Sequence, residues 1–180
     1  MVISLPVFSG FPQMFGWTFG LRRIRYINFT GICMKKSRKE MAQDNFLAGY
    51  NCAQSIALAF SDMTGLDKEV LSKIACTFGG GMGRLREVCG ALSGVFMITG
   101  LLYGYFEPEE GEVKAEQYRK IQELGKRFRE KNGSMICREL LGLGEGASNY
   151  IPTQRNEKYY EERPCLRIIG NAAEILEEYI

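Results

Sequence analysis

The feature that most constrains the fold of this chain is an uncharged segment at residues 88–106, which follows a glycine-rich turn. Glycines stand at positions 90, 94, 100 and 104 of the segment, in pairs four residues apart. Residues four apart lie on one face of a helix, and glycine there lets a neighbouring helix approach closely. The segment therefore predicts a central helix that is buried among other helices, an environment that explains it better than a lipid bilayer does.

Helical patterns continue on both sides of this segment. Ser37 and Asn51 are common helix caps, and Asp67-Lys68-Glu69 begins a third helix with acids at its N-terminus, as the helix dipole favours. Apolar residues at helical spacing follow in the second and third of these helices. The main predicted helices cover residues 38–48, 52–63, 67–78, 88–106, 112–130 and 165–179, with a short helix at 134–141. Residues 142–163 are predicted to form a long loop that Tyr159 and Tyr160 attach to the body. We therefore predict an all-α, compact single-domain bundle of about six helices around a buried Gly-rich central helix.

Residues 1–33 differ in composition from the rest of the chain. Residues 1–21 are uncharged but are interrupted by proline and glycine, and basic residues follow this stretch instead of preceding it as in a signal peptide. We expect residues 1–33 to be an N-terminal extension, disordered or derived from an upstream start codon. A weak membrane-surface anchor is the alternative. The helical four-cysteine domain is predicted to cover residues 34–180.

Composition excludes several classes of function. The net charge of +2 is too small to indicate nucleic-acid binding, and the hydrophobic and charged fractions are those of an ordinary soluble protein. The chain contains no histidine, which excludes Ser/His/Asp and Cys/His catalysis. The absence of histidine also excludes imidazole ligands for zinc, non-haem iron or haem. Any metal would be held by thiolates, carboxylates or a partner chain.

The cysteines are the strongest candidates for chemistry. Six are present, without a CxxC pair, and we expect a reducing, cytoplasmic location. Four of them fall in or near the first turn of a predicted helix: Cys52, Cys89, Cys137 and Cys165. Unpaired N–H groups and the helix dipole stabilise a thiolate at such positions. Arg84, Arg86, Arg138 and Arg163 stand within a few residues of these cysteines. Cys76 is predicted to be a small core residue.

The motifs around these cysteines resemble a known family. They are Asn51-Cys52-Ala53-Gln54, the glycine turn at residues 78–83, Cys89-Gly90-Ala91-Leu92-Ser93-Gly94, and then Cys137 and Cys165. Residues 44–173 resemble the redox-active protein family named for the pattern C…GCAxxG…C…C, although the central motif here is CGAxxG. The resemblance implies an all-helical domain, common in anaerobes, whose four characteristic cysteines are Cys52, Cys89, Cys137 and Cys165. Related split-Soret-type cytochromes need CxxCH for haem, which is absent here, so no haem is expected.

Two classes of function remain open from the sequence. In the first, the four cysteines form a redox site, either as ligands of an iron–sulfur cluster in electron transfer or as a thiol/disulfide site, and a structural zinc is the remaining variant. In the second, the chain is a non-catalytic helical module that binds a small anion or a protein partner through the glycine loop. The candidate binding residues of that loop are Gly79, Gly80, Gly81, Gly83, Arg84 and Arg86. The sequence does not reveal the electron-transfer partner or substrate, and it leaves a homodimer open; no membrane or nucleic-acid partner is expected.

Overall fold

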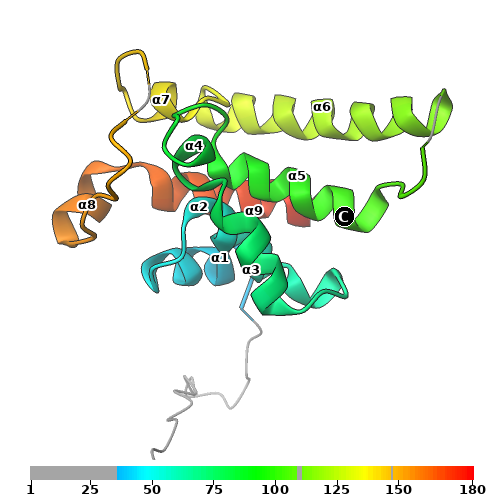
Figure 1. Cartoon of the computed structure of the whole chain (residues 1–180), viewed down its shortest axis with the longest axis horizontal. Coiled ribbons are helices and arrows are strands. Elements are labelled where there is room, and N and C mark those ends of the chain that lie inside the picture. Colours follow the sequence, from blue (N-terminus) through cyan, green and yellow to red (C-terminus); the bar gives the residue numbers. More distant parts are fainter. Residues whose placement is uncertain (1–35, 109–110, 147) are drawn as a thin grey trace, which may run out of the picture. The chain divides into compact units, whose positions relative to one another are not determined.

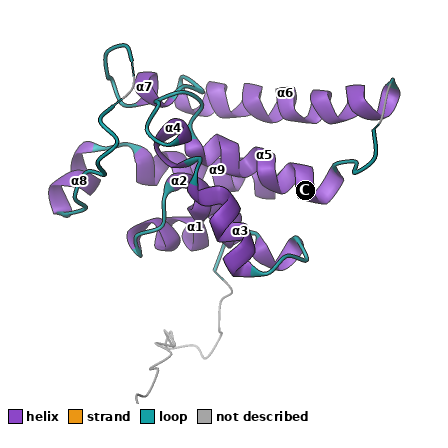
Figure 2. Cartoon of the chain, viewed as in Figure 1, coloured by secondary structure: helices purple, strands orange, loops and turns teal. Residues whose placement is uncertain are grey.

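The computed structural model describes residues 36–108, 111–146 and 148–180, and in these ranges the regular structure is helical, without a strand (Figures 1 and 2). Six helices of the described ranges have eight residues or more: α1 (Arg38–Leu47), α2 (Cys52–Ala59), α3 (Lys68–Cys76), α5 (Gly90–Tyr103), α6 (Glu112–Asn132) and α9 (Cys165–Glu177). The shorter elements are η1 (Ser61–Met63), α4 (Gly79–Met82), α7 (Cys137–Leu140) and α8 (Glu157–Glu162). The predicted all-α class is confirmed. The predicted extension at residues 1–33 lies outside the described residues.

Local capping sets where the first three long helices begin. Ser37 accepts a hydrogen bond from the backbone of Glu40, whose carboxylate accepts one from the backbone of Ser37 in return. Asn51 and Gln54 form the same reciprocal arrangement before α2. Asp67 caps α3 by accepting from two backbone N–H groups. These bonds satisfy donors that would otherwise have no partner, so short stretches of sequence are enough to determine these starts.

The core is organised around α2, which contacts α1, α3, α5 and α9. Helix α5 packs on α2 through glycine: a Cβ added at Gly94 would lie 2.8 Å from the Cβ of Ile56. The predicted glycine stripe is correct for this buried half of α5 and wrong farther along. A Cβ at Gly100 would meet nothing within 4 Å, and Leu101 and Tyr103 are exposed. Among the described residues, no helix has the length and apolar character needed to cross a membrane.

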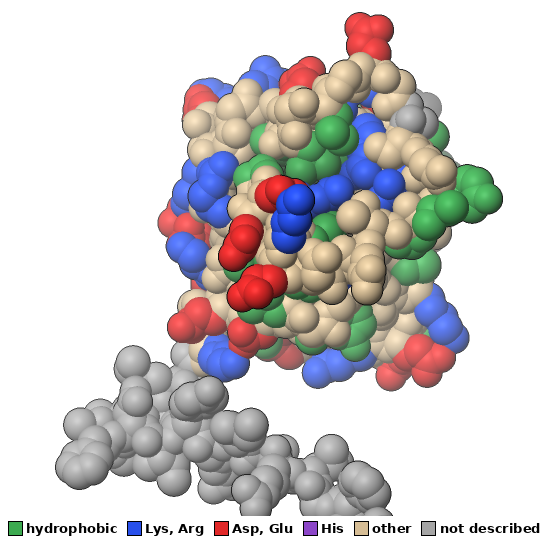
Figure 3. All heavy atoms as spheres, turned by 90° about the vertical axis from the view of Figure 1, so that its left-hand side faces the viewer, with side chains coloured by type: hydrophobic (Ala, Val, Ile, Leu, Met, Phe, Trp, Pro, Cys, Tyr) green, Lys and Arg blue, Asp and Glu red, His purple; other side chains and the backbone are tan. Residues whose placement is uncertain are grey.

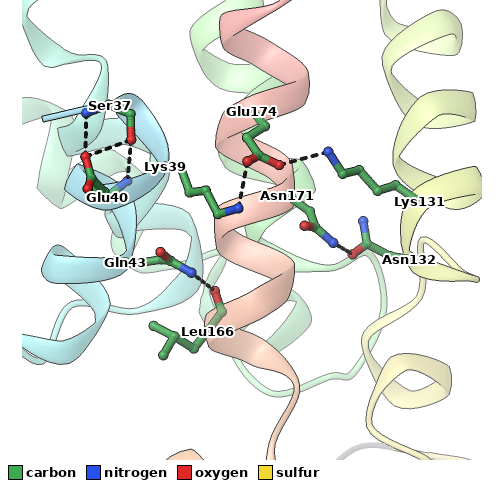
Figure 4. Close-up of polar contacts among 9 residues, drawn as sticks. All are labelled: Ser37, Lys39, Glu40, Gln43, Lys131, Asn132, Leu166, Asn171 and Glu174. Atoms are coloured by element: carbon green, nitrogen blue, oxygen red, sulfur yellow. Dashed lines mark hydrogen bonds and ion pairs between the residues drawn. The ribbon is translucent and has the colours of Figure 1, made fainter.

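Polar contacts connect α9 to the helices on either side of it (Figure 4). The carboxylate of Glu174 in α9 pairs with Lys39 of α1 at 2.7 Å and with Lys131 of α6 at 2.9 Å. Closer to the start of α9, the side chain of Gln43 donates to the carbonyl of Leu166 at 3.2 Å. The first and last helices of the described domain are therefore held together along their length.

The predicted loop at residues 142–163 contains one helix that the sequence analysis missed. Helix α8 is short and is capped by Asn156, whose side chain accepts from the backbone of Tyr159. The rings of Tyr159 and Tyr160 pack on Phe46 of α1, with ring centroids 6.4 and 5.7 Å away. The prediction that these tyrosines attach the loop to the body is confirmed. Arg155 adds two hydrogen bonds, one to the backbone carbonyl of Phe46 in the last turn of α1 and one to that of Tyr50 in the turn before α2.

Candidate functional site

Four cysteines begin four different helices. Cys52, Cys137 and Cys165 are the first residues of α2, α7 and α9, and Cys89 is the N-cap of α5. The predicted position of each cysteine at a helix start is confirmed. Two of these four starts differ from the predicted ones. Helix α5 begins at Gly90, whereas the sequence predicted a start at residue 88, and α7 begins at Cys137, whereas the sequence predicted a start at Ser134. The Ser134 hydroxyl instead accepts from the backbone N–H of Ile136 and so supports the turn before the helix.

A short antiparallel contact brings two of these helix starts together. Val88 and Ile136, which directly precede Cys89 and Cys137, form an isolated β-bridge. The backbone N–H groups of Cys89 and Cys137 donate across this contact, at 2.8 and 2.7 Å. Because the bridge aligns the chain immediately before α5 with the chain before α7, the first residues of the two helices lie close together.

All four of these cysteines line one small cavity of about 20 Å³. The backbone approaches closely around it, which requires glycine at two positions. A Cβ at Gly81 would lie 2.6 Å from the Cβ of Cys137, and one at Gly90 would lie 3.2 Å from the Cβ of Cys52. The structure thus brings together the four cysteines that the sequence analysis selected, although they are far apart along the chain.

The other two cysteines are not part of this cluster. Cys76 is the last residue of α3 and is exposed, so its prediction as a core residue is wrong. The cause is the rotation of α3, which buries Leu71 and Ala75 but exposes the apolar Val70 and Ile74. Cys33 lies outside the described residues.

Cys52 and Cys165 form a hydrogen-bonded thiol pair with opposite acidities. The hydrogen bond from Cys52, together with Arg163, Arg86 and Arg155, lowers the pKa of Cys165 to about 7 despite burial. The same hydrogen bond and burial raise the pKa of Cys52 well above its ordinary value, because Cys52 must keep its proton to donate it. As pH rises, Cys165 therefore ionises first and Cys52 remains the donor.

For the other two thiols, burial affects the pKa more than the nearby hydrogen-bond donors and positive charges do. It raises the pKa of Cys89 to about 12, although the backbone N–H groups of Ala91 and Leu92 oppose this change. Burial also raises the pKa of Cys137, against the opposing effect of Arg86, whose Nη1 donates to the Cys137 Sγ at 3.7 Å. The expectation that helix N-termini would acidify all four thiols is therefore wrong for Cys52, Cys89 and Cys137. Removing a thiolate from water costs more than the helix dipole returns.

A second, more open cavity of about 190 Å³ adjoins the thiol cluster and shares Cys52, Cys137 and Cys165 with it. The exposed Cys76 also lines this second cavity. Four arginines line it: Arg84, Arg86, Arg155 and Arg163. We call it the arginine pocket. Two of these residues belong to the glycine loop proposed from sequence, whereas nothing in the sequence pattern pointed to Arg155. Arg138 lies elsewhere and pairs with Glu87 at 2.9 Å.

The glycine loop is an irregular segment that contributes to both cavities. Its residues Gly80, Gly81 and Gly83 have positive φ, and so do the non-glycine residues Met82, Arg84 and Arg86. Left-handed backbone at three non-glycine positions is strained and often marks a functional segment. Of the loop residues proposed from sequence, Gly80 and Gly81 line the thiol cavity, and Gly79, Gly80, Arg84 and Arg86 line the arginine pocket. Gly83 lines neither.

The thiols as they stand do not fit a metal centre. Among the described residues, no group of three or more Cys, Asp or Glu side chains is placed to hold a metal ion. The thiol cavity measures about 20 Å³, which is enough for about one water molecule. An iron–sulfur cluster is several times larger than a water molecule, so the thiols would have to move apart to enclose one.

The order and spacing of the cysteine motifs can be compared with known families. A family described as "Putative redox-active protein (C_GCAxxG_C_C)" matches residues 50–179. The chain belongs to this family. The match includes all four clustered cysteines and the glycine loop, so the redox-active family suggested by the sequence is confirmed for this C_GCAxxG_C_C protein. No match was found among curated proteins or among solved structures.

Proposed function

We propose that this C_GCAxxG_C_C protein is a dithiol–disulfide redox protein in which Cys165 and Cys52 form the reactive pair. The observation that carries the proposal is that Cys165 and Cys52 both line the wall shared by the thiol cavity and the arginine pocket, where the interaction between them lowers the pKa of Cys165. Both side chains are half-buried, whereas Cys89 and Cys137 are 6% and 7% exposed. Cys137 also lines the arginine pocket but is buried, and Cys89 does not line it, so a substrate entering from this pocket would find Cys165 and Cys52 more accessible than the other two thiols.

The opposite acidities of the pair assign one role to each thiol. The Cys165 thiolate attacks one sulfur of a substrate disulfide, forms a mixed disulfide and releases one substrate thiolate. Cys52 then gives its proton to the departing thiolate, attacks the Cys165 sulfur and releases the second substrate thiolate. The protein loses two electrons and gains the Cys52–Cys165 disulfide, while the substrate becomes two thiols. A reducing dithiol partner restores the pair by the reverse exchange.

The buried thiols give the pair a neutral surrounding. Because Cys89 and Cys137 are protonated, they place little negative charge next to the Cys165 thiolate. Four ionised thiols in one cavity would instead repel one another. Arg86 stands against Cys137 and contributes positive charge from the same side. The arrangement therefore stabilises one thiolate among the four, which is what a nucleophile requires. Ligation of a metal by all four cysteines would require four thiolates.

The test is to count thiols and metal in the full-length protein purified without oxygen. The expected preparation is colourless, contains no stoichiometric iron or zinc, and loses two thiols reversibly when treated with a small disulfide. Peptide mass spectrometry should identify the new bond as Cys52–Cys165. Cys76→Ser, which changes the exposed thiol that lines the arginine pocket but not the thiol cavity, should still form this bond. Brown protein whose iron disappears in Cys89→Ser would instead support the iron–sulfur interpretation and refute the dithiol proposal.

A further inference from the structure

The arginine pocket concentrates positive charge that its own walls do not balance. In the part of the chain that the structure describes, its lining includes four arginines and neither Asp nor Glu. Figure 3 views the side of the molecule that carries α7 and α8, and basic side chains extend across the middle of that face. The ion pairs of the described residues use other arginines and lysines, and none includes a residue of the pocket lining.

Arg84 and Arg86 project from the glycine loop, and the positive charge of each is destabilised by its surroundings. Arg86 is 3% exposed, and its Nε donates to the hydroxyl of Ser148 at 2.6 Å. A buried guanidinium is costly when it is satisfied by neutral groups and has no carboxylate partner. Burial, followed by the charges of Arg86 and Arg163, lowers the pKa of Arg84. An anion in the pocket would relieve both effects.

Arg155 and Arg163 are held in place before any ligand arrives. Arg155 donates to the carbonyls of Phe46 and Tyr50, and its guanidinium lies 5.7 Å from the Tyr159 ring centroid. Arg163 lies 4.6 Å from the same centroid. Positively charged groups fixed in advance lose little conformational entropy when they bind an anion.

The Cys165 thiolate does not account for all of this charge. One thiolate can balance one guanidinium, which leaves most of the positive charge in the pocket uncompensated. Arginine binds carboxylate and phosphate groups well because its planar donors match two oxygens at once. The pocket, at about 190 Å³, is smaller than the roughly 300–1,000 Å³ of a site for a whole drug-sized ligand. It therefore suits one acidic group and the atoms next to it.

We infer that the arginine pocket binds a carboxylate or phosphate group of the substrate, and that the substrate of the Cys165–Cys52 pair is a small anionic disulfide. This inference rests on the proposed dithiol function. The acidic group would occupy the arginines while the disulfide bond lies against Cys165, so that binding energy aligns the sulfur atoms for exchange.

The first experiment compares disulfides of different charge. Reduced full-length protein is oxidised by glutathione disulfide (anionic), hydroxyethyl disulfide (neutral) and cystamine (cationic), and each rate is divided by the rate for a free small thiol. The expected order is anionic, neutral, cationic. Losing one pocket arginine should reduce the preference for the anionic over the neutral reagent by roughly tenfold, which corresponds to about 1.4 kcal/mol. Added salt should reduce it as well.

The variants are Arg84→Gln and Arg163→Gln, and the matched control is Arg167→Gln. Arg167 lies two residues after Cys165 on the same helix, is exposed and does not line the pocket. Each variant removes one positive charge, so a general effect of net charge would appear in all three. Far-ultraviolet circular dichroism checks folding, and Arg163→Gln alone suffices if Arg84→Gln, with its left-handed backbone, fails to fold. Equal normalised rates for the three disulfides would overturn the inference. A loss of anionic preference in Arg167→Gln as large as that in the pocket variants would overturn it too.

A second measurement separates this inference from the dithiol proposal. Calorimetry at constant ionic strength measures binding of inorganic phosphate and of malonate to Cys165→Ser, which has no nucleophile. Binding that persists in Cys165→Ser and is lost when Arg163→Gln is added supports the anion site, and the two ligands distinguish phosphate from carboxylate recognition. If neither ion binds the protein, the anion site is refuted even where the Cys52–Cys165 disulfide forms. If an ion binds but the thiols do not react with any disulfide, the anionic-disulfide inference fails together with the dithiol function, and a non-catalytic anion-binding module is left.

Discussion

Replacing Cys52 with alanine tests the acidity of Cys165 directly. The hydrogen bond from Cys52 is the largest cause that lowers the pKa of Cys165 to about 7. A hydrogen bond to a charged group contributes about 1.5–3 kcal/mol, and one pKa unit corresponds to about 1.4 kcal/mol. Cys52→Ala should therefore raise the pKa of Cys165 by roughly 1–2 units. The nearby arginines remain, so the pKa should not rise far above that of an ordinary thiol.

At neutral pH, Cys52→Ala should lower the fraction of Cys165 that is present as the nucleophilic thiolate. With a pKa of about 7, roughly half of Cys165 is thiolate at pH 7. After a rise of 1–2 units the thiolate fraction falls to roughly a tenth or less. Alkylation of Cys165 by iodoacetamide should slow accordingly at pH 7 and recover at higher pH.

The assay follows alkylation of the Cys165 peptide by mass spectrometry from about pH 5 to 10. Resolving the peptide matters because interacting thiols titrate together, and a bulk signal would report the pair and not one residue. Cys76→Ala, which removes the exposed thiol that lines the arginine pocket but not the thiol cavity, is the control and should leave the profile unchanged. A Cys165 midpoint that stays near 7 in Cys52→Ala would refute the assigned hydrogen bond. A wild-type profile in which Cys52 titrates near 7 would reverse the two roles.

Three further predictions concern stability, each measured by urea unfolding. Gly94→Ala should lower the free energy of unfolding by about 1–3 kcal/mol because its Cβ meets Ile56, whereas Gly100→Ala on the open half of the same helix should raise it by about 0.5–1 kcal/mol; equal effects would contradict the packing of α5. Glu174→Gln should cost about 0.5–1 kcal/mol at pH 7, since its two ion pairs are partly exposed. Those ion pairs lower the pKa of Glu174, so this difference should vanish as pH falls below the ordinary carboxyl range, and a difference that persists at pH 3 would be inconsistent with an ionic cause. Because burial raises the pKa of Cys89 to about 12, the folded state should lose stability as pH rises above about 8.5, where the unfolded thiol ionises, and Cys89→Ala should reduce this loss while Cys76→Ala should not.

Several features of this protein depend only on neighbouring residues, and these were predictable. Ser37, Asn51 and Asp67 start helices through contacts with backbone groups two or three residues away, so a short stretch of sequence contains the whole interaction. The same holds for the glycine at position 133, whose left-handed backbone ends α6. The four cysteines could be assigned to helix starts because that assignment follows from these local boundaries.

Errors arose where the outcome depended on what a helix faces. The apolar residues of α3 are periodic, but the period alone did not show that Ile74 and Cys76 would be exposed. Two glycines of α5 differ for the same reason. A Cβ added at Gly94 would contact Ile56 of α2, whereas one added at Gly100 would have no neighbour within 4 Å.

The chain by itself determined its helical class, its helix starts and the four cysteines placed at them. Tertiary structure decided which two of those thiols form the hydrogen-bonded pair, which two are desolvated, and that Arg155 joins Arg84, Arg86 and Arg163 beside them. The physical reason is range. Capping and helix dipoles act within a turn or two of the chain, whereas desolvation and charge–charge interactions depend on every group that folding brings near, however distant in sequence.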